Sequence, residues 1–144
     1  MELNQNRQLI TNWLTLSTIQ MNISNELESV LQQHHQLALN EFYVLLYLSQ
    51  APEKKLKLQQ LQNMVGLSQS AMSRLVSRFE AKGCGTLRRH ICGDDRRAIY
   101  TSLTAEGEEK LNKAFVTFNE TLKKAFSNEL IQEELERLIH QINE

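Results

Sequence analysis

A short stretch of this chain concentrates hydroxyl, amide and guanidinium side chains at helical spacing. Its members are Ser68, Gln69, Ser70, Ser73, Arg74 and Arg78. Small hydroxyls and an amide can approach base edges closely in a major groove, and an arginine can reach a purine edge or a phosphate. The N-terminus of a helix adds backbone N–H donors for a phosphate. The chemistry open to these side chains is hydrogen bonding to a nucleic acid.

Four arginines flank a turn a few residues further on, two on each side. Arg88 and Arg89 precede Gly93-Asp94-Asp95, and Arg96 and Arg97 follow it. A cationic hairpin in this place can lie along the sugar-phosphate backbone and put an arginine into the minor groove. We expect Asp95 not to contact DNA but to accept hydrogen bonds from guanidinium or N–H groups of the turn, and so to orient the arginines.

Charge is unevenly distributed along the chain. The 144 residues carry 16 Lys and Arg and 17 Asp and Glu, a net charge of −1. The segment from Glu53 to Leu103 holds ten of the basic and four of the acidic residues, so its net charge is +6 and that of the rest is −7. A polyanionic partner for this segment would offset its self-repulsion. The alternative is a solvated basic face that binds nothing.

A helix-turn-helix would position the first group of side chains. Leu58–Val65 and Gln69–Lys82 carry apolar residues at helical period. Gly66 is placed for a left-handed turn between them, and Ser68 can cap the second helix. The apolar positions of that helix would face the core: Met72, Leu75, Val76 and Phe79. Such helix pairs also occur in proteins that do not bind DNA, so the pattern alone leaves both interpretations open.

Short segments with β-branched residues predict the hairpin, and longer periodic segments predict helices around it. Thr86–Ile91 and Arg97–Leu103 are expected to pair, with Lys54–Lys57 as a short edge strand. Helices are predicted for Leu9–Leu31, for Glu41–Ser49 after an Asn40 N-cap, after Thr104, and for a last segment starting at Ser127. The predicted fold class is mainly α with a small β-hairpin wing, a winged helix-turn-helix between N- and C-terminal helices.

Composition argues against several classes of protein. The 41% hydrophobic and 23% charged residues are ordinary for a globular chain. The longest apolar run, Phe42–Leu48, is too short to span a bilayer, and two Cys without a secretory context favour free thiols in the cytoplasm. No phosphate-binding loop, nucleophile elbow or His-Glu-x-x-His run occurs. The sequence therefore predicts no enzymatic activity, no cofactor and no metal site.

Several motifs resemble the MarR family of bacterial transcription regulators. Asp95-Arg96-Arg97-Ala98, followed by Leu103-Thr104-Ala105-Glu106-Gly107, resembles the wing-to-helix signature of that family. The run from Gly66-Leu67-Ser68 through Ser73-Arg74-Leu75-Val76 to Phe79-Glu80-Ala81-Lys82-Gly83 is similar to its helix-turn-helix. The resemblance covers the whole chain in length and element order. It implies a sequence-specific, DNA-binding transcription regulator.

The resemblance also implies a two-fold dimer in which the first, fifth and sixth helices interlock. Residues 1–35 and 104–144 would then form a helical dimerisation region and residues 36–103 a DNA-binding lobe. The apolar residues expected to need a partner surface are Phe115, Phe118, Phe126, Leu138, Ile139 and Ile142. The alternative is that they fill the core of a single chain. A dimer would bind double-stranded DNA at a pseudo-palindromic operator, with two recognition helices about one DNA turn apart.

The resemblance further implies a trigger that lowers DNA affinity, a small aromatic acid or phenol bound between the dimer helices and the lobe. Residues that could line such a pocket, or could be plain core, are Trp13, Met21, Phe42, Tyr43 and Tyr47. Cys84 and Cys92 flank a basic segment that favours thiolate, so an oxidation switch is a second hypothesis. The prediction is thus a cytoplasmic, dimeric repressor released by a ligand or by thiol oxidation. The rival is a helical protein-interaction module whose basic middle docks an acidic partner.

Overall fold

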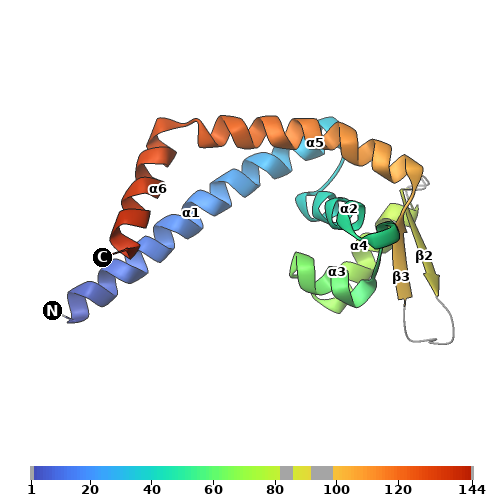
Figure 1. The fold of residues 1–144 in the computed structure, drawn as a ribbon, viewed down its shortest axis with the longest axis horizontal. Coiled ribbons are helices and arrows are strands. Elements are labelled where there is room, and N and C mark those ends of the chain that lie inside the picture. Colours follow the sequence, from blue (N-terminus) through green and yellow to red (C-terminus); the bar gives the residue numbers. More distant parts are fainter. Residues whose placement is uncertain (1, 82–85, 92–98, 144) are drawn as a thin grey trace.

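The computed structural model describes residues 2–81, 86–91 and 99–143, which form an elongated molecule with a lobe at one end (Figure 1). In chain order the elements are α1 (Glu2–His35), α2 (Leu39–Gln50), a 3-10 turn (Pro52–Lys54), β1 (Lys55–Lys57), α3 (Leu58–Val65), α4 (Gln69–Ala81), β2 (Leu87–Ile91), β3 (Ile99–Leu103), α5 (Ala105–Phe126) and α6 (Glu129–Ile142). We term α2–α4 with the three strands the lobe, and α1, α5 and α6 the helical arm. Helices around a small sheet confirm the predicted fold class.

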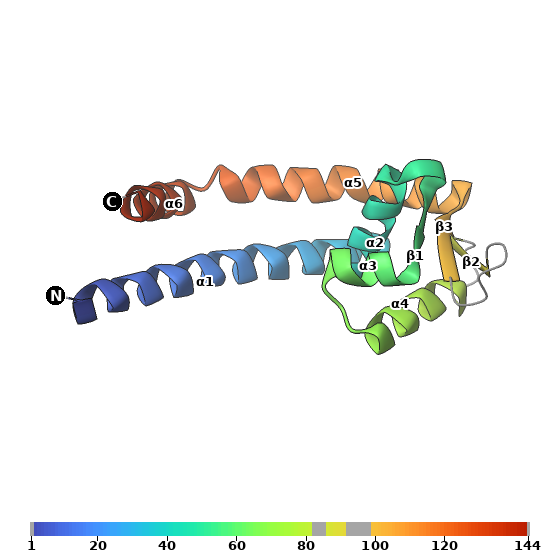
Figure 2. The ribbon, with the colours of Figure 1, turned by 60° about the horizontal axis from the view of Figure 1, so that its bottom comes forward.

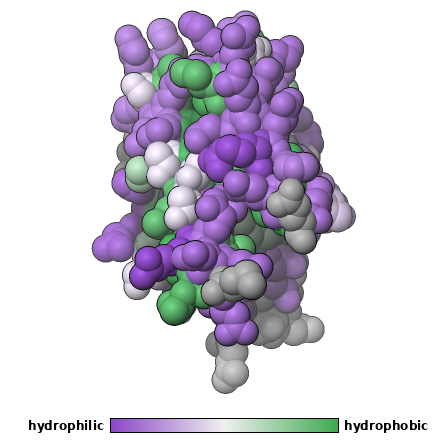
Figure 3. Space-filling view, turned by 90° about the vertical axis from the view of Figure 1, so that its left-hand side faces the viewer, coloured by the Kyte–Doolittle hydropathy of each residue, from purple (hydrophilic) through white to green (hydrophobic). Residues whose placement is uncertain are grey.

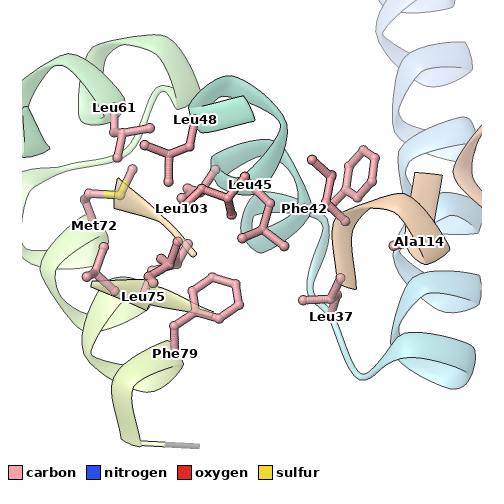
Figure 4. Packing of buried hydrophobic residues seen from close by; sticks show 14 of the residues in the cluster. Leu37, Phe42, Leu45, Leu48, Leu61, Met72, Leu75, Phe79, Leu103 and Ala114 are labelled. Carbon is pink, nitrogen blue, oxygen red and sulfur yellow. The ribbon is translucent and has the colours of Figure 1, made fainter. Parts of the chain in front are cut away.

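An apolar cluster holds the helices of the lobe against the sheet (Figure 4). The four apolar residues of α4 that the sequence assigns to the core are each at most 2% exposed: Met72, Leu75, Val76 and Phe79. They belong to one cluster with Leu45 and Leu48 of α2 and with Leu61 of α3. Burying these side chains is the main favourable contribution to folding of the lobe. Because this side of α4 faces the core, its opposite side is left to solvent.

Three antiparallel strands in the order β1–β3–β2 close one side of the lobe. Side chains alternate between the two faces of such a sheet. Leu87, Thr101 and Leu103 are buried on the inner face, which lies against the helices of the lobe. The predicted edge strand is confirmed, but it starts at Lys55 because Glu53 and Lys54 have positive φ, +57° and +55°, within the 3-10 turn.

The helical arm leaves the lobe as two long helices, α1 and α5, that run side by side (Figures 1 and 2). α6 then folds back across α1 and brings the ends of the described chain close together. Two contacts hold α5 in place near the lobe, one with α2 and one with α1. The ring of Phe42 stacks on that of Phe118, with centroids 4.4 Å apart, and the Nε2 of His35 lies 2.7 Å from the Oγ1 of Thr117.

Large apolar side chains are exposed at the far end of the arm. They include Leu9, Ile10, Trp13, Leu14, Leu130, Ile139 and Ile142, each between 58% and 73% exposed. Figure 3 looks onto this end and shows hydrophobic side chains among hydrophilic ones. The prediction that six arm residues need a partner is wrong for Phe118, which packs on Phe42, and for Leu138, which is 3% exposed. Both find neighbours within the same chain, whereas Phe115, Phe126, Ile139 and Ile142 do not become buried.

The predicted start of α2 is wrong by two residues. The helix begins at Leu39 with Ala38 as the N-cap residue, rather than at Glu41 after Asn40. The Oε1 of Glu41 accepts a hydrogen bond from the N–H of Ala38 at 2.8 Å, and the carboxylate of Glu28 in α1 accepts one from the N–H of Leu39. These two carboxylates satisfy the N–H groups of the N-cap residue and of the first helical residue, which have no partner within the helix.

Two further boundaries differ from the prediction. α6 is capped by Asn128, whose Oδ1 accepts from the N–H groups of Leu130 and Ile131, and Ser127 ends α5 instead. α1 extends over 34 residues, beyond the predicted Leu9–Leu31, because no Pro or Gly interrupts the polar residues at either end. Despite this length, no helix among the described residues is apolar enough over a sufficient span to cross a membrane.

Candidate nucleic-acid interface

The start of α4 is set by the two local features that the sequence predicts. Gly66 has a φ of +82°, the left-handed conformation that glycine adopts readily, and it ends α3. The Oγ of Ser68 accepts a hydrogen bond from the N–H of Ala71 at 3.2 Å. These features fix the direction in which α4 leaves the turn, and therefore the orientation of every side chain along it.

Polar residues occupy the solvent side of α4. Ser68, Gln69, Ser70, Arg74 and Arg78 are exposed, and Ser73 is half-buried. Arg74 and Arg78 lie one helical turn apart and border a shallow hollow with Ala71, Ser73 and Ser77. α4 lies on the side of the lobe that faces away from α5 (Figure 2). The six residues predicted for the recognition helix thus share one accessible surface that the helical arm does not cover.

The two arginines of β2 point to opposite faces of the sheet. Arg88 is exposed, whereas Arg89 is half-buried and turned towards α4. The Nε of Arg89 lies 3.4 Å from the Oε1 of Glu80, and its Nη2 donates a hydrogen bond to the Oγ of Ser77 at 3.2 Å. Arg89, predicted as a DNA contact, joins β2 to α4 through these two groups, and its role in DNA binding stays a prediction. Strict alternation along a strand was the signal that could have separated the two arginines.

Five predicted functional residues lie outside the described residues. They are Asp95, Arg96 and Arg97 of the wing and the two cysteines, Cys84 and Cys92. Their predicted roles in minor-groove binding, in orienting the arginines and in oxidation stay predictions. Among the residues that are described, no three His, Cys, Asp or Glu side chains gather into a group that could hold a metal ion.

The five residues predicted for a ligand pocket are not gathered in one place within the chain. Trp13 and Met21 lie on α1, 65% and 53% exposed, whereas Phe42 is fully buried in the core at the start of α2. Helical rise puts Trp13 about 30 Å from the end of α1 that meets α2. Tyr43 and Tyr47 are half-buried, and Tyr43 stands edge-on to Phe118 with centroids 6.2 Å apart. Burial raises the pKa of Tyr43, with a smaller contribution from Tyr47.

Sequence reasoning missed a second group of cations, on the outer face of the sheet. Lys55 and Lys57 of β1 lie near the ring of Tyr100 of β3, with Nζ atoms 5.7 Å and 5.9 Å from its centroid. The register pairs Lys55 with Ser102, and Ser102 with Arg88. Two lysines separated by one residue in a strand share a face, and that spacing was the available signal.

Comparisons with known proteins agree on the kind of fold. A model described as MarR family matches residues 35–98. Sco3205 of Streptomyces coelicolor, a MarR family transcriptional regulator solved in complex with DNA, is 22% identical and superposes with a TM-score of 0.75 over 94% of this chain and 84% of that chain. BldR, a transcriptional regulator from Sulfolobus solfataricus, is 24% identical, with a TM-score of 0.74 over 99% and 98%. NadR, solved in complex with 4-hydroxyphenylacetate, is 18% identical, with a TM-score of 0.66 over 90% and 89%. No curated protein matches the sequence.

The family model and the superposed structures both cover the elements described above. Residues 35–98 contain α2, α3, α4 and β2, including the capped turn and the exposed polar surface of α4. The solved structures share the long helices as well, because the superpositions extend over nearly the whole chain. The resemblance predicted from the sequence is therefore confirmed: residues 35–98 match the MarR family model, and the solved structures that share this fold include a MarR family transcriptional regulator.

Proposed function

We propose that this protein is a cytoplasmic, dimeric transcription regulator that binds a pseudo-palindromic operator and acts as a repressor. One observation carries the proposal: α4 presents its hydroxyl, amide and guanidinium groups on one accessible surface, beside a hairpin in a segment with a net charge of +6. Sco3205, which shares the fold, is a regulator solved in complex with DNA. This surface has the length and polarity of a helix that enters a major groove.

The exposed apolar residues of the arm support a dimer. Leu9, Trp13, Leu130 and Ile142 are more than half exposed at the same end of the molecule. Large apolar side chains exposed together at one end mark an interaction site, since no helix among the described residues could cross a membrane. A second copy related by a two-fold axis would cover it, since such an interface uses the same surface of both subunits. Two copies would present their α4 helices at spacings of about 34–36 Å, one turn of DNA.

DNA binding is tested with a duplex selected by the protein from a random library. Arg74→Ala removes a cation from α4 and should weaken binding by about 1–3 kcal/mol while lowering the salt slope by about 1 per lost phosphate contact. Lys113→Ala is the matched control, because Lys113 is an exposed cation on α5 that pairs with Glu109. Fluorescence anisotropy against NaCl concentration measures both quantities. Equal slopes for Arg74→Ala and the wild type would exclude α4 as the DNA contact.

A small aromatic acid is the proposed trigger, and the joint between α2 and α5 is its proposed site. NadR binds 4-hydroxyphenylacetate, and here Tyr43 offers a half-buried phenol beside Phe42 and Phe118. Trp13 and Met21 could take part only through the partner subunit of a dimer, because of their distance from this joint in one chain. A ligand that prefers the DNA-free state must lower DNA affinity by linkage.

Thermal-shift screening with 4-hydroxyphenylacetate and related acids, followed by anisotropy with DNA, tests this trigger. We expect a compound that raises the melting temperature to release DNA, and Tyr43→Phe to weaken both effects. A ligand that stabilises the protein without changing DNA affinity would count against the proposal. Thiol oxidation is the alternative trigger: a variant with Cys84 and Cys92 replaced by Ser would then no longer release DNA on treatment with peroxide.

A further inference from the structure

The outer face of the sheet holds cations that are separate from the recognition surface of α4. The register places Lys55, Ser102 and Arg88 in one row across the three strands, and Lys57 opposite Tyr100 in the next row. Side chains directly opposite each other in an antiparallel sheet share a face. We term Lys55, Lys57, Arg88, Tyr100 and Ser102 the outer-sheet patch.

Contacts within the outer-sheet patch leave most of its charge uncompensated. Lys55 and Lys57 approach the ring of Tyr100, which attracts an ammonium group electrostatically without neutralising it. Glu53 pairs with Lys55, with 2.9 Å between the Oε2 and the Nζ. Among the described residues, no acidic side chain pairs with Lys57 or Arg88. The patch therefore attracts an anionic partner.

The outer-sheet patch does not face the DNA groove that α4 itself would enter. The buried inner-face residues pack on the helices of the lobe, and in Figure 1 these helices lie on one side of β2 and β3. The outer-sheet patch consequently points away from α4. A duplex held by α4 can reach it only by curving around the edge of the lobe.

Flanking duplex is nevertheless the partner that tethering favours. Once α4 holds an operator, the adjoining base pairs stay tethered near the patch, so their phosphates are present at a high effective concentration. A separate acidic protein would first have to give up its translational and rotational freedom. Bending costs elastic energy, and in proteins that curve DNA this cost is offset by the additional phosphate contacts that the bend allows.

We propose that the outer-sheet patch is a second, sequence-independent DNA contact, which binds the phosphate backbone of duplex flanking the operator. The inference rests on the proposed function, because the tethering depends on α4 holding the operator. The patch adds affinity and bends the DNA, and it contributes nothing to the choice of sequence, since phosphates are the same in every sequence.

Two duplexes of different length test the proposal. One contains 20 bp centred on a sequence that the wild-type protein selects from a random library, and the other adds 15 bp of arbitrary sequence on each side. We expect the wild type to bind the longer duplex about tenfold more tightly in 100 mM NaCl. We also expect its salt slope to be steeper by up to about 3.6, for two lysine–phosphate contacts in each of two subunits.

Variants separate the patch from the recognition helix. Lys55→Ala/Lys57→Ala should lose the advantage of the longer duplex and keep the wild-type affinity for the 20-bp duplex. Arg88→Ala should lower the same advantage in part. Lys113→Ala/Lys124→Ala is the matched control, because it removes two exposed cations of α5 that do not belong to the patch, and it should keep the full length effect.

The outcomes separate failure of this inference from failure of the proposed function. Equal binding of both lengths by the wild type, or a length effect that survives Lys55→Ala/Lys57→Ala, overturns the second contact while leaving α4 binding intact. Failure to select or bind any duplex overturns the proposed function itself. DNA bending, measured by fluorescence transfer between the ends of the longer duplex, should fall in Lys55→Ala/Lys57→Ala and stay unchanged in the control.

Discussion

The lobe and the helical arm differ in how far their apolar side chains are buried. In the lobe, Leu45, Leu48 and Val76 are completely buried against neighbours of the same chain. In the arm, Trp13 and Leu130 are 65% and 73% exposed although they belong to well-formed helices. Since burial of apolar surface drives folding, the lobe gains its stability within one chain. The arm retains apolar surface that one chain does not bury.

The two regions are joined by a shared core rather than by a linker. Leu31 of α1 and Leu111 and Ala114 of α5 belong to the same buried cluster as the lobe residues, and Phe118 packs against that cluster. The core thus crosses both boundaries predicted at residues 36 and 103. A substitution at the lobe end of α5 should therefore alter the stability of the lobe. A substitution at the far end of α5 should affect only association.

The largest expected effect is on folding, from truncating a residue in the shared core. Phe42→Ala removes a fully buried ring that stacks on Phe118, and should lower the free energy of unfolding by about 3–5 kcal/mol. Trp13→Ala at a 65% exposed position is the contrasting variant, expected to change it by less than about 1 kcal/mol in the monomer. Urea denaturation at low protein concentration measures both. A similar loss in both variants would abolish the contrast between lobe and arm.

The next effect concerns association. Ile139→Asp/Ile142→Asp puts charges on side chains that are 59% and 66% exposed in one chain. The lobe should stay folded and the proposed dimer should dissociate. Operator affinity should then fall about 100-fold or more, because two linked half-sites become two separate ones. Sedimentation velocity and anisotropy measure these changes, with the exposed Glu136→Gln as control. A double variant that remains dimeric would show that this face is not the interface.

A smaller effect is expected where the two regions meet. A Cβ on Gly107 in the first turn of α5 would lie 2.2 Å from the backbone oxygen of Thr86 and 2.7 Å from the Cδ1 of Leu103. The backbone of one element must shift, so Gly107→Ala should destabilise the protein by about 1–3 kcal/mol. Glu106→Ala, its exposed neighbour, should be nearly neutral. Thermal unfolding compares the two variants. Equal melting temperatures would mean that the backbone near Gly107 shifts at little cost.

The smallest effect is a pH dependence at His35, where the end of α1 meets α5. Burial lowers the pKa of His35 below its usual 6.5, with smaller contributions from His34 and Lys110. The unfolded chain therefore binds the proton more readily, and His35 makes the free energy of unfolding fall as pH drops through about 6.5. Between pH 7.5 and 5.5, His35→Gln should lose less stability than the wild type while keeping a hydrogen-bonding group near Thr117. Identical losses in urea denaturation would assign the dependence to other groups.

Local patterns predicted much of the fold because they depend on neighbours in sequence. The left-handed Gly66, the Ser68 cap, the Thr104 cap and the inward residues of α4 all follow from spacing and residue type. The start of α2 could not be predicted in this way. It depends on Glu28, eleven residues away in another helix, whose carboxylate accepts a hydrogen bond from the N–H of Leu39.

The same distinction between local and long-range effects applies to the candidate site. Residue types placed the polar surface on α4, and periodicity showed which side of that helix would be exposed. Arg89 could not be assigned from its charge, because the positions of Glu80 and Ser77 decide which way its guanidinium is held.

Propensity and periodicity act over a few residues, so the sequence sufficed to predict the order of the helices, the turn between α3 and α4 and the side of α4 that meets solvent. The tertiary structure was needed to show that Leu138 is buried, that Phe118 packs on Phe42 and that Ile139 and Ile142 are exposed. It alone also brought Lys55, Lys57 and Arg88 onto one face, across strands that lie about thirty residues apart in the chain. Burial and charge clustering are sums over neighbours in space, and chain order does not fix which neighbours those are.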